Sequence, residues 1–213
     1  MKKKEIVPTI LSKDPEEVEK RIKVLEGKVE RFQFDLIDGI FLPEKTVGLE
    51  VLRQIETPLQ IDVHLMTNRP EEWVERVEEV MADRIIGQVE KMDSQEKFIT
   101  SGVEAGLEVG LGLSPETPVS VIEENLSKLD LVLVLTRQPG FGDFPFDEKT
   151  LEKVRKIREL VGEHLDICVD GGVTAKNIKK CAQAGANLFA IGGAIWRAQD
   201  IGTQIEKLKK LAR

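Results

Sequence analysis

Residues 165–194 read LDICVDGGVTAKNIKKCAQAGANLFAIGGA, and this stretch decides the fold. An apolar segment at 165–169 ends in a glycine pair, and a helical pattern at 175–184 leads to a second apolar segment at 188–191 that ends in another glycine pair. The hydrophobic period thus changes from that of a strand to that of a helix and back. This pattern is typical of a β-α-β unit with parallel strands.

The same alternation extends over the rest of the chain. Further strands are predicted at 6–11, 32–37, 59–66, 84–89, 107–113 and 129–135. Further helices are predicted at 15–26, 49–55, 70–81, 94–105, 119–126, 148–160 and 201–211. About eight strand–helix pairs is the number that a closed parallel barrel requires. We therefore expect residues 1–213 to form a single (β/α)8 TIM barrel.

The positions of the glycines separate this barrel from an open doubly wound sheet. An open sheet usually has a glycine-rich turn after its first strand, whereas here residues 12–15 read SKDP. The glycines follow the sixth, seventh and eighth strands instead, where barrels bind phosphate. Backbone N–H groups at glycines approach an anion closely, and the helix expected near Ala194 would direct its positive end there. The six are Gly140, Gly142, Gly171, Gly172, Gly192 and Gly193.

Composition excludes several classes of protein. The formal net charge of −7 argues against a nucleic-acid partner, which needs clustered Lys and Arg. No apolar run reaches the roughly 20 residues of a membrane helix, and no signal-peptide pattern precedes the first strand. A cytoplasmic location is the expectation. Cys168 and Cys181 are then expected to stay reduced.

Polar residues at the ends of otherwise apolar strands indicate the site. Asp35, His64 and Asp170 end the second, third and seventh strands, and in a parallel barrel these ends meet at one mouth. Two carboxylates and an imidazole suit a divalent metal, and the carboxylates could also act as base and acid on opposite faces of a substrate. The plainer interpretation is that both Asp residues cap helices or bind loop amides. His164 is assigned no role.

Seven short blocks, in order along the chain, resemble those of ribulose-phosphate 3-epimerases. They are VPTILS (7–12), DLIDGIFLP (35–43), DVHLM (62–66), GLSPETP (112–118), PGFG (139–142), VDGGV (169–173) and GGAI (192–195). The resemblance implies an isomerase that interconverts ribulose 5-phosphate and xylulose 5-phosphate, or acts on a close ketose-phosphate relative. It also implies a homo-oligomer and a place in pentose-phosphate metabolism.

The resemblance further implies the role of each site residue. Asp35 and Asp170 would transfer protons at C3 through an enediolate, with one removing the proton and the other returning it to the opposite face. Asp35, His64, Asp170 and Gln33 would surround a divalent metal ion (zinc, iron, manganese or cobalt) that stabilises the enediolate oxygen. Substrate and phosphate would be bound by Thr9, Met66, Phe141 and the six glycines named above.

Some positions depart from the family pattern near the metal. Gln33 replaces a histidine ligand, and an amide carbonyl binds zinc or iron more weakly than imidazole does. Gln88 stands where many members have His, and Ile37 and Leu135 replace two methionines. These changes leave both carboxylates in place and predict weaker binding of a zinc-type ion.

Other departures lie in the loops expected to bind phosphate. Gly193 replaces a Ser and loses a hydroxyl, and Asp143 replaces a Gly. A carboxylate there would repel phosphate unless it turns to solvent or pairs with Arg137.

These departures keep two alternative functions open. One is a diverged barrel that binds a phosphorylated ligand without epimerising it. The other is a lyase or decarboxylase of the phosphate-binding barrels, although the expected Asp-x-Lys-x-x-Asp pattern is absent because residues 62–64 read DVH.

Overall fold

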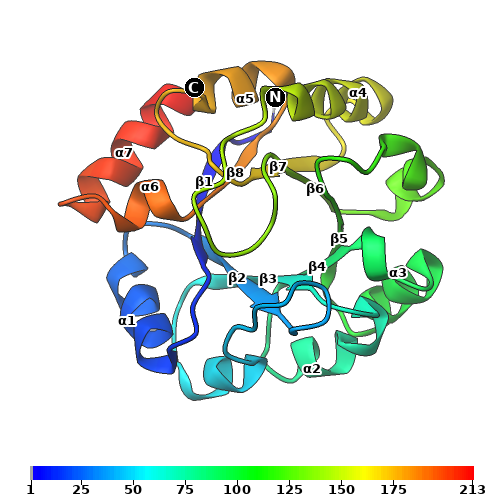
Figure 1. Cartoon of the computed structure of the whole chain (residues 1–213), viewed down its shortest axis with the longest axis horizontal. Helices are drawn as coiled ribbons and strands as arrows, with labels where there is room; N and C mark the ends of the chain where they lie inside the picture. The colour runs from blue at the N-terminus through cyan, green and yellow to red at the C-terminus, as the bar shows by residue number, and fades with distance from the viewer. Residues whose placement is uncertain (1) are drawn as a thin grey trace.

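The computed structural model describes residues 2–213 and shows a closed barrel of eight parallel strands in sequential order, β1 next to β8 (Figure 1). The strands are β1 (Glu5–Ile10), β2 (Arg31–Ile37), β3 (Gln60–Met66), β4 (Arg84–Gln88), β5 (Glu108–Leu113), β6 (Leu131–Leu135), β7 (Asp166–Asp170) and β8 (Leu188–Ile191). The predicted (β/α)8 barrel is confirmed, and each predicted strand is found within about two residues at either end.

Helices form a ring around the strands (Figure 1). They are α1 (Pro15–Leu25), α2 (Val74–Glu78), α3 (Gln95–Glu104), α4 (Leu151–Val161), α5 (Ile178–Ala184), α6 (Gly193–Trp196) and α7 (Ile201–Ala212). Helices α1, α3 and α7 are each preceded by a capping residue, Asp14, Ser94 and Asp200, whose side chain accepts from a backbone N–H group of the first turn.

Three expected helices differ most from the prediction, and the helix expected at 148–160 begins with a 3-10 turn, Glu148–Thr150, before α4. The segments after β2 and β5 are 3-10 turns (Leu49–Gln54, Val119–Val121 and Glu123–Lys128) that begin without a side-chain cap. The helix expected at 70–81 is divided into a 3-10 turn, Pro70–Glu72, and the short α2. Met81, with a positive φ of 54°, lies beyond the end of α2. A side-chain cap normally stabilises the first turn of an α-helix, and the 3-10 segments after β2 and β5 lack one.

Side chains alternate between two cores because the strand period is two. In β2, Phe32, Phe34 and Leu36 belong to the large core between strands and helices. A second, smaller apolar cluster fills the barrel interior and includes Leu133 of β6 and Cys168 of β7. The residues of β2 that alternate with the outer set are Arg31, Gln33, Asp35 and Ile37. The barrel interior therefore has an arginine at one end of β2 and a carboxylate at the other.

Two further expectations are that both cysteines stay reduced and that no segment forms a membrane helix. Cys168 and Cys181 are both buried and free. Within residues 2–213, no helix combines the length and the apolar character that crossing a membrane demands.

Candidate functional site

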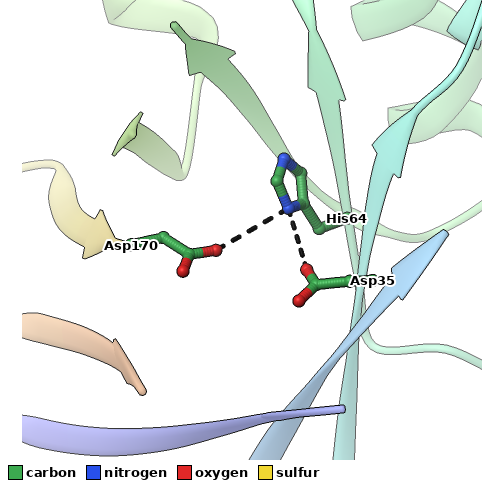
Figure 2. A group of neighbouring side chains, drawn as sticks. All are labelled: Asp35, His64 and Asp170. Atoms are coloured by element: carbon green, nitrogen blue, oxygen red, sulfur yellow. Dashed lines mark hydrogen bonds and ion pairs between the residues drawn. The ribbon is translucent and has the colours of Figure 1, made fainter. Parts of the chain in front are cut away.

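Three strands bring the predicted triad together at the carboxyl end of the barrel. Asp35 of β2 and His64 of β3 are paired in register, and Asp170 ends β7. Strands β1 and β8 separate β2 from β7, so the two carboxylates approach from different sides of the mouth. One ligand atom from each of the three residues lies within 4.8 Å of the others (Figure 2). The predicted convergence is confirmed.

His64 is fully buried and held at both ring nitrogens. Its Nδ1 lies 2.9 Å from Asp35 Oδ1 and 3.8 Å from Asp170 Oδ2 (Figure 2). The Gln88 amide satisfies its neighbours when its carbonyl faces the ring: Oε1 accepts from His64 Nε2 at 3.0 Å, while the amide nitrogen donates to Glu90 Oε2 at 2.8 Å. Gln88 thus fixes the ring and directs Nδ1 toward the carboxylates.

Gln33 lies between the two carboxylates. Its Nε2 donates to Asp35 Oδ1 and to Asp170 Oδ2, both at 2.7 Å, and lies 3.4 Å from His64 Nδ1. Gln33 is 1% exposed, so these contacts are shielded from solvent. They connect the two carboxylates through neutral N–H groups.

The environment of Asp170 disfavours its charged form. Burial raises the pKa of this carboxyl, and the neighbouring charge of Asp35 raises it further, to about 7. His64, the hydrogen bond from Gln33 and Arg137 act in the opposite direction. A carboxyl that exchanges its proton near neutral pH is suited to general acid–base chemistry.

A cavity of about 610 Å³ opens above the triad. Nearly all of the residues predicted to contact substrate line it: Thr9, Asp35, Gly140, Phe141, Gly142, Asp170, Gly171, Gly172, Gly192 and Gly193. Met66 is not among the lining residues and is buried in β3. The loop between β6 and α4 lines the cavity over residues 140–146 and passes over the barrel opening in Figure 1.

At two glycines of the cavity a side chain would meet a neighbouring arginine. Gly171 has a φ of 107°, and a Cβ there would lie 2.5 Å from Cγ of Arg137. At Gly193 a Cβ would lie 2.8 Å from Nη2 of Arg197. The Ser that the family pattern has at position 193 would therefore collide with this guanidinium unless the arginine moved.

The partner of Asp143 is Arg197. Its Oδ1 lies 3.2 Å from Arg197 Nη1, and both side chains are mostly exposed. Arg137, the partner considered from the sequence, instead donates to the carbonyl oxygens of Gly140 and Gly142. Asp143 therefore lies at the cavity beside a cation that the sequence interpretation did not consider.

The cavity residues that the sequence interpretation missed include Arg21, Trp196 and Arg197. The guanidinium of Arg21 stacks on the Trp196 ring at 4.8 Å, and Trp196 Nε1 donates to the Thr9 carbonyl at 2.7 Å. One sequence signal was available, because Trp196 and Arg197 fall within one helical turn of the last glycine pair. His164 is exposed outside the site, as expected.

The donor set matches the chemistry of a divalent cation. Asp35 and Asp170 offer carboxylate oxygens, and His64 offers an imidazole nitrogen whose opposite N–H is already bound, as in many metal sites. Gln33 is different, since the atom it presents to this group is an N–H donor that cannot bind a cation. The three predicted ligands fit a metal ion, and Gln33 fits only if its amide turns over.

Solved structures of other barrels share this fold at low sequence identity. The 3-hexulose-6-phosphate synthase of Salmonella typhimurium superposes with a TM-score of 0.69 at 14% identity, covering 98% of both chains. The orotidine 5'-phosphate decarboxylase of Pyrococcus horikoshii OT3 gives 0.70 at 16% identity, covering 98% of this chain and 99% of that one. Structural similarity at 14–16% sequence identity shows the shared barrel fold alone.

Sequence comparison is far more specific. The sequence model described as "Ribulose-phosphate 3 epimerase family" matches residues 5–196. The ribulose-phosphate 3-epimerase of Bacillus subtilis (strain 168) is 34% identical over 212 residues, which cover 96% of this chain and 97% of that protein. The enzyme of the same name from Escherichia coli (strain K12) is 32% identical, with 98% and 96% covered. The chain belongs to the ribulose-phosphate 3-epimerase family.

Proposed function

We propose that this protein is an isomerase that interconverts ribulose 5-phosphate and xylulose 5-phosphate at C3. One observation carries the proposal: the carboxylates of Asp35 and Asp170 lie on different sides of a single cavity, within 4.8 Å of one imidazole nitrogen. Inversion at a carbon needs a base on one face and an acid on the other. The family membership of the chain supplies the substrate class.

The reaction follows from this geometry. One carboxylate removes the proton from C3, and the electron pair of the C–H bond forms a C2–C3 double bond while the C2 carbonyl oxygen becomes negative. The other carboxyl group then donates a proton to the opposite face of C3, and the C2 carbonyl is restored. Because the reaction is reversible, Asp35 and Asp170 exchange the roles of base and acid between the two directions.

Asp35, His64 and Asp170 would hold a divalent ion, whether zinc, iron, manganese or cobalt, and Gln33 could add its carbonyl oxygen after rotation of the amide. When bound, such an ion supplies positive charge that stabilises the oxygen at C2. His64 is prepared for this contact by Gln88, which binds the ring nitrogen on the far side. The protein's own contribution is to place the two carboxyl groups and to keep water from the buried side of the site.

The phosphate group would be bound by the loops that follow β6, β7 and β8. Gly171, Gly172, Gly192 and Gly193 line the same cavity as the carboxylates, and Arg197 adds a positive charge beside Gly193. Backbone N–H groups in such loops are suited to a phosphate dianion. Thr9 and Phe141, which line the cavity, remain proposed substrate contacts, and so does Met66, which is buried in β3 and does not line it.

A protein that only binds a phosphorylated ligand is not favoured, because neither proton-transfer carboxylate has been lost. The homo-oligomer implied by the family resemblance and the cytoplasmic location expected from composition remain parts of this proposal. Light scattering of the purified protein would test the first.

The direct test is an assay of purified protein with ribulose 5-phosphate, with xylulose 5-phosphate measured by a coupling enzyme. Conversion by wild type, and its loss in Asp35→Asn, is the expected result. Binding of the sugar phosphate without conversion, with or without added divalent ions, would contradict the proposed function.

A further inference from the structure

Gln33 is the residue of this site that replaces a histidine of the family pattern. Its amide nitrogen lies between the two reacting carboxylates. Its position in β2 is fixed by the strand period, since Gln33 and Asp35 point to the same inner face two residues apart. The amide nitrogen reaches Asp170 across the barrel as well, at 2.7 Å. A single neutral side chain therefore joins the ends of β2 and β7.

Chemistry determines which way this amide faces. If the oxygen of Gln33 stood at the position of Nε2, it would lie 2.7 Å from two carboxylate oxygens, all three of them acceptors. With nitrogen there, the two amide hydrogens serve two carboxylates. Hydrogen bonds to ionised acceptors are the stronger kind. The observed orientation is thus favoured as long as both carboxylates remain free of a cation.

A bound divalent ion would need the opposite arrangement. It would draw the same carboxylate oxygens of Asp35 and Asp170, and Gln33 would have to give up both hydrogen bonds and turn its carbonyl oxygen inward. An amide oxygen is a weaker ligand than imidazole for zinc-type ions. Ion binding and the Gln33 bridge therefore compete for the same carboxylate atoms.

We propose that Gln33 is a positioning residue that replaces the divalent ion in holding the two carboxylates together, so that this enzyme binds the ion weakly and still epimerises without it. The amide bridge keeps Asp35 and Asp170 at their working separation and prevents their mutual repulsion from spreading them apart. The inference rests on the proposed function for its activity measurements, but not for its measurements of ion binding.

The test compares wild type with Gln33→His and Gln33→Met, each treated with a chelator and checked for residual metal by mass spectrometry. Without ions, wild type is expected to keep its activity within about tenfold of the ion-loaded value, whereas Gln33→His falls by roughly 100-fold or more and recovers with Zn²⁺ or Co²⁺, in line with the effect of an essential ion. Gln33→Met, which has similar volume and no donors, should lose kcat without ions while KM for the sugar phosphate changes little.

Ion affinity gives a measurement that does not depend on turnover. Calorimetric titration with Zn²⁺, and Co²⁺ titration followed by visible absorption, should show affinity about tenfold to 100-fold higher in Gln33→His than in wild type. Gln54→His is the matched control, because residue 54 is exposed and lies in the 3-10 turn after β2, away from the cavity. It adds an imidazole and should change neither ion affinity at the site nor activity.

Two results would overturn the inference. One is that chelated wild type loses activity as completely as chelated Gln33→His and recovers it with the same ion. The other is equal Zn²⁺ affinity in the two proteins. If no variant is active in any condition, the proposed function fails, and the affinity comparison alone then decides whether Gln33 competes with the ion.

Discussion

The two ends of the barrel interior both contain buried carboxylates, but their partners differ. At the amino end, Asp62 lies between two guanidinium groups, with Oδ1 2.7 Å from Arg31 Nη1 and Oδ2 3.1 Å from Arg84 Nη1. At the carboxyl end, Asp35 and Asp170 have no Lys or Arg partner within 4 Å in the described chain, and they share Gln33 and His64 instead.

This difference separates a structural site from a chemical one. Burial raises the pKa of Asp62, while the positive charges of Arg84 and Arg31 oppose that change. Burial and the charge of Asp35 raise the pKa of Asp170 to about 7, although His64, the hydrogen bond from Gln33 and Arg137 oppose the change. The carboxylate of Asp62 is held in place by two arginine ion pairs, whereas the carboxyl of Asp170 lines the cavity and has a pKa near neutral pH, which suits proton exchange with a substrate.

The largest expected effect is at the carboxyl end. Asp35→Asn and Asp170→Asn should each lower kcat by about 10²- to 10⁴-fold, since each removes a general acid or base. Circular dichroism and unfolding midpoints should remain close to wild type, because neither residue supports a guanidinium. Near-normal turnover in either variant would contradict the assignment of the chemistry to the carboxyl end of the barrel.

At the amino end the same substitution should act on stability. Asp62→Asn leaves two buried guanidinium groups with one partner fewer, and removing one member of a buried ion pair typically costs about 3 kcal/mol or more. Arg84 keeps its contact with Glu108, which limits the loss. Urea unfolding would measure it. Activity per folded molecule should stay within about twofold of wild type, as expected for a residue remote from the reacting atoms.

The support of His64 can be tested separately. Gln88→Met removes the carbonyl that accepts from His64 Nε2, and the ring loses the contact that orients it. Loss of such a partner commonly lowers activity or ion affinity by about 10- to 100-fold. Steady-state kinetics should show a lower kcat at similar KM. An unchanged kcat would mean that Asp35 alone is enough to hold the ring.

The smallest effect is expected at the rim of the cavity. Asp143→Gly removes a negative charge and frees Arg197, so KM for the sugar phosphate should fall by about two- to fivefold at low salt, with kcat unchanged. The change should shrink at high salt, because both side chains are exposed. Arg197→Gln is the opposing variant and should raise KM. If Asp143→Gly leaves KM unchanged at low salt, this carboxylate does not sense the phosphate.

Sequence reasoning predicted the barrel because alternating strand and helix periods are local properties. It was less successful with the helices after β2, β3 and β5, where the structure has 3-10 turns without side-chain caps and, after β3, positive φ angles at Arg69 and Met81. Asp35, His64 and Asp170 were found because a polar residue at the end of an apolar strand has few structural explanations.

The partners of these residues could not be predicted in the same way. The bridge from Gln33 to Asp170 depends on the distance across the closed barrel and on the orientation of an amide. The pairing of Asp143 with Arg197, rather than Arg137, depends on how two loops meet at the rim. The arginines at the amino end had one unused signal, since Arg31 and Arg84 each begin a strand and alternate with inward-facing residues.

The most direct test follows the C3 proton of ribulose 5-phosphate in D2O by proton NMR, with purified wild type and with Gln54→His, a substitution outside the cavity, as the control. We predict that the C3 signal disappears as the solvent deuteron enters, together with formation of xylulose 5-phosphate, in both proteins. A C3 proton that persists at enzyme concentrations where the sugar phosphate is bound would contradict it.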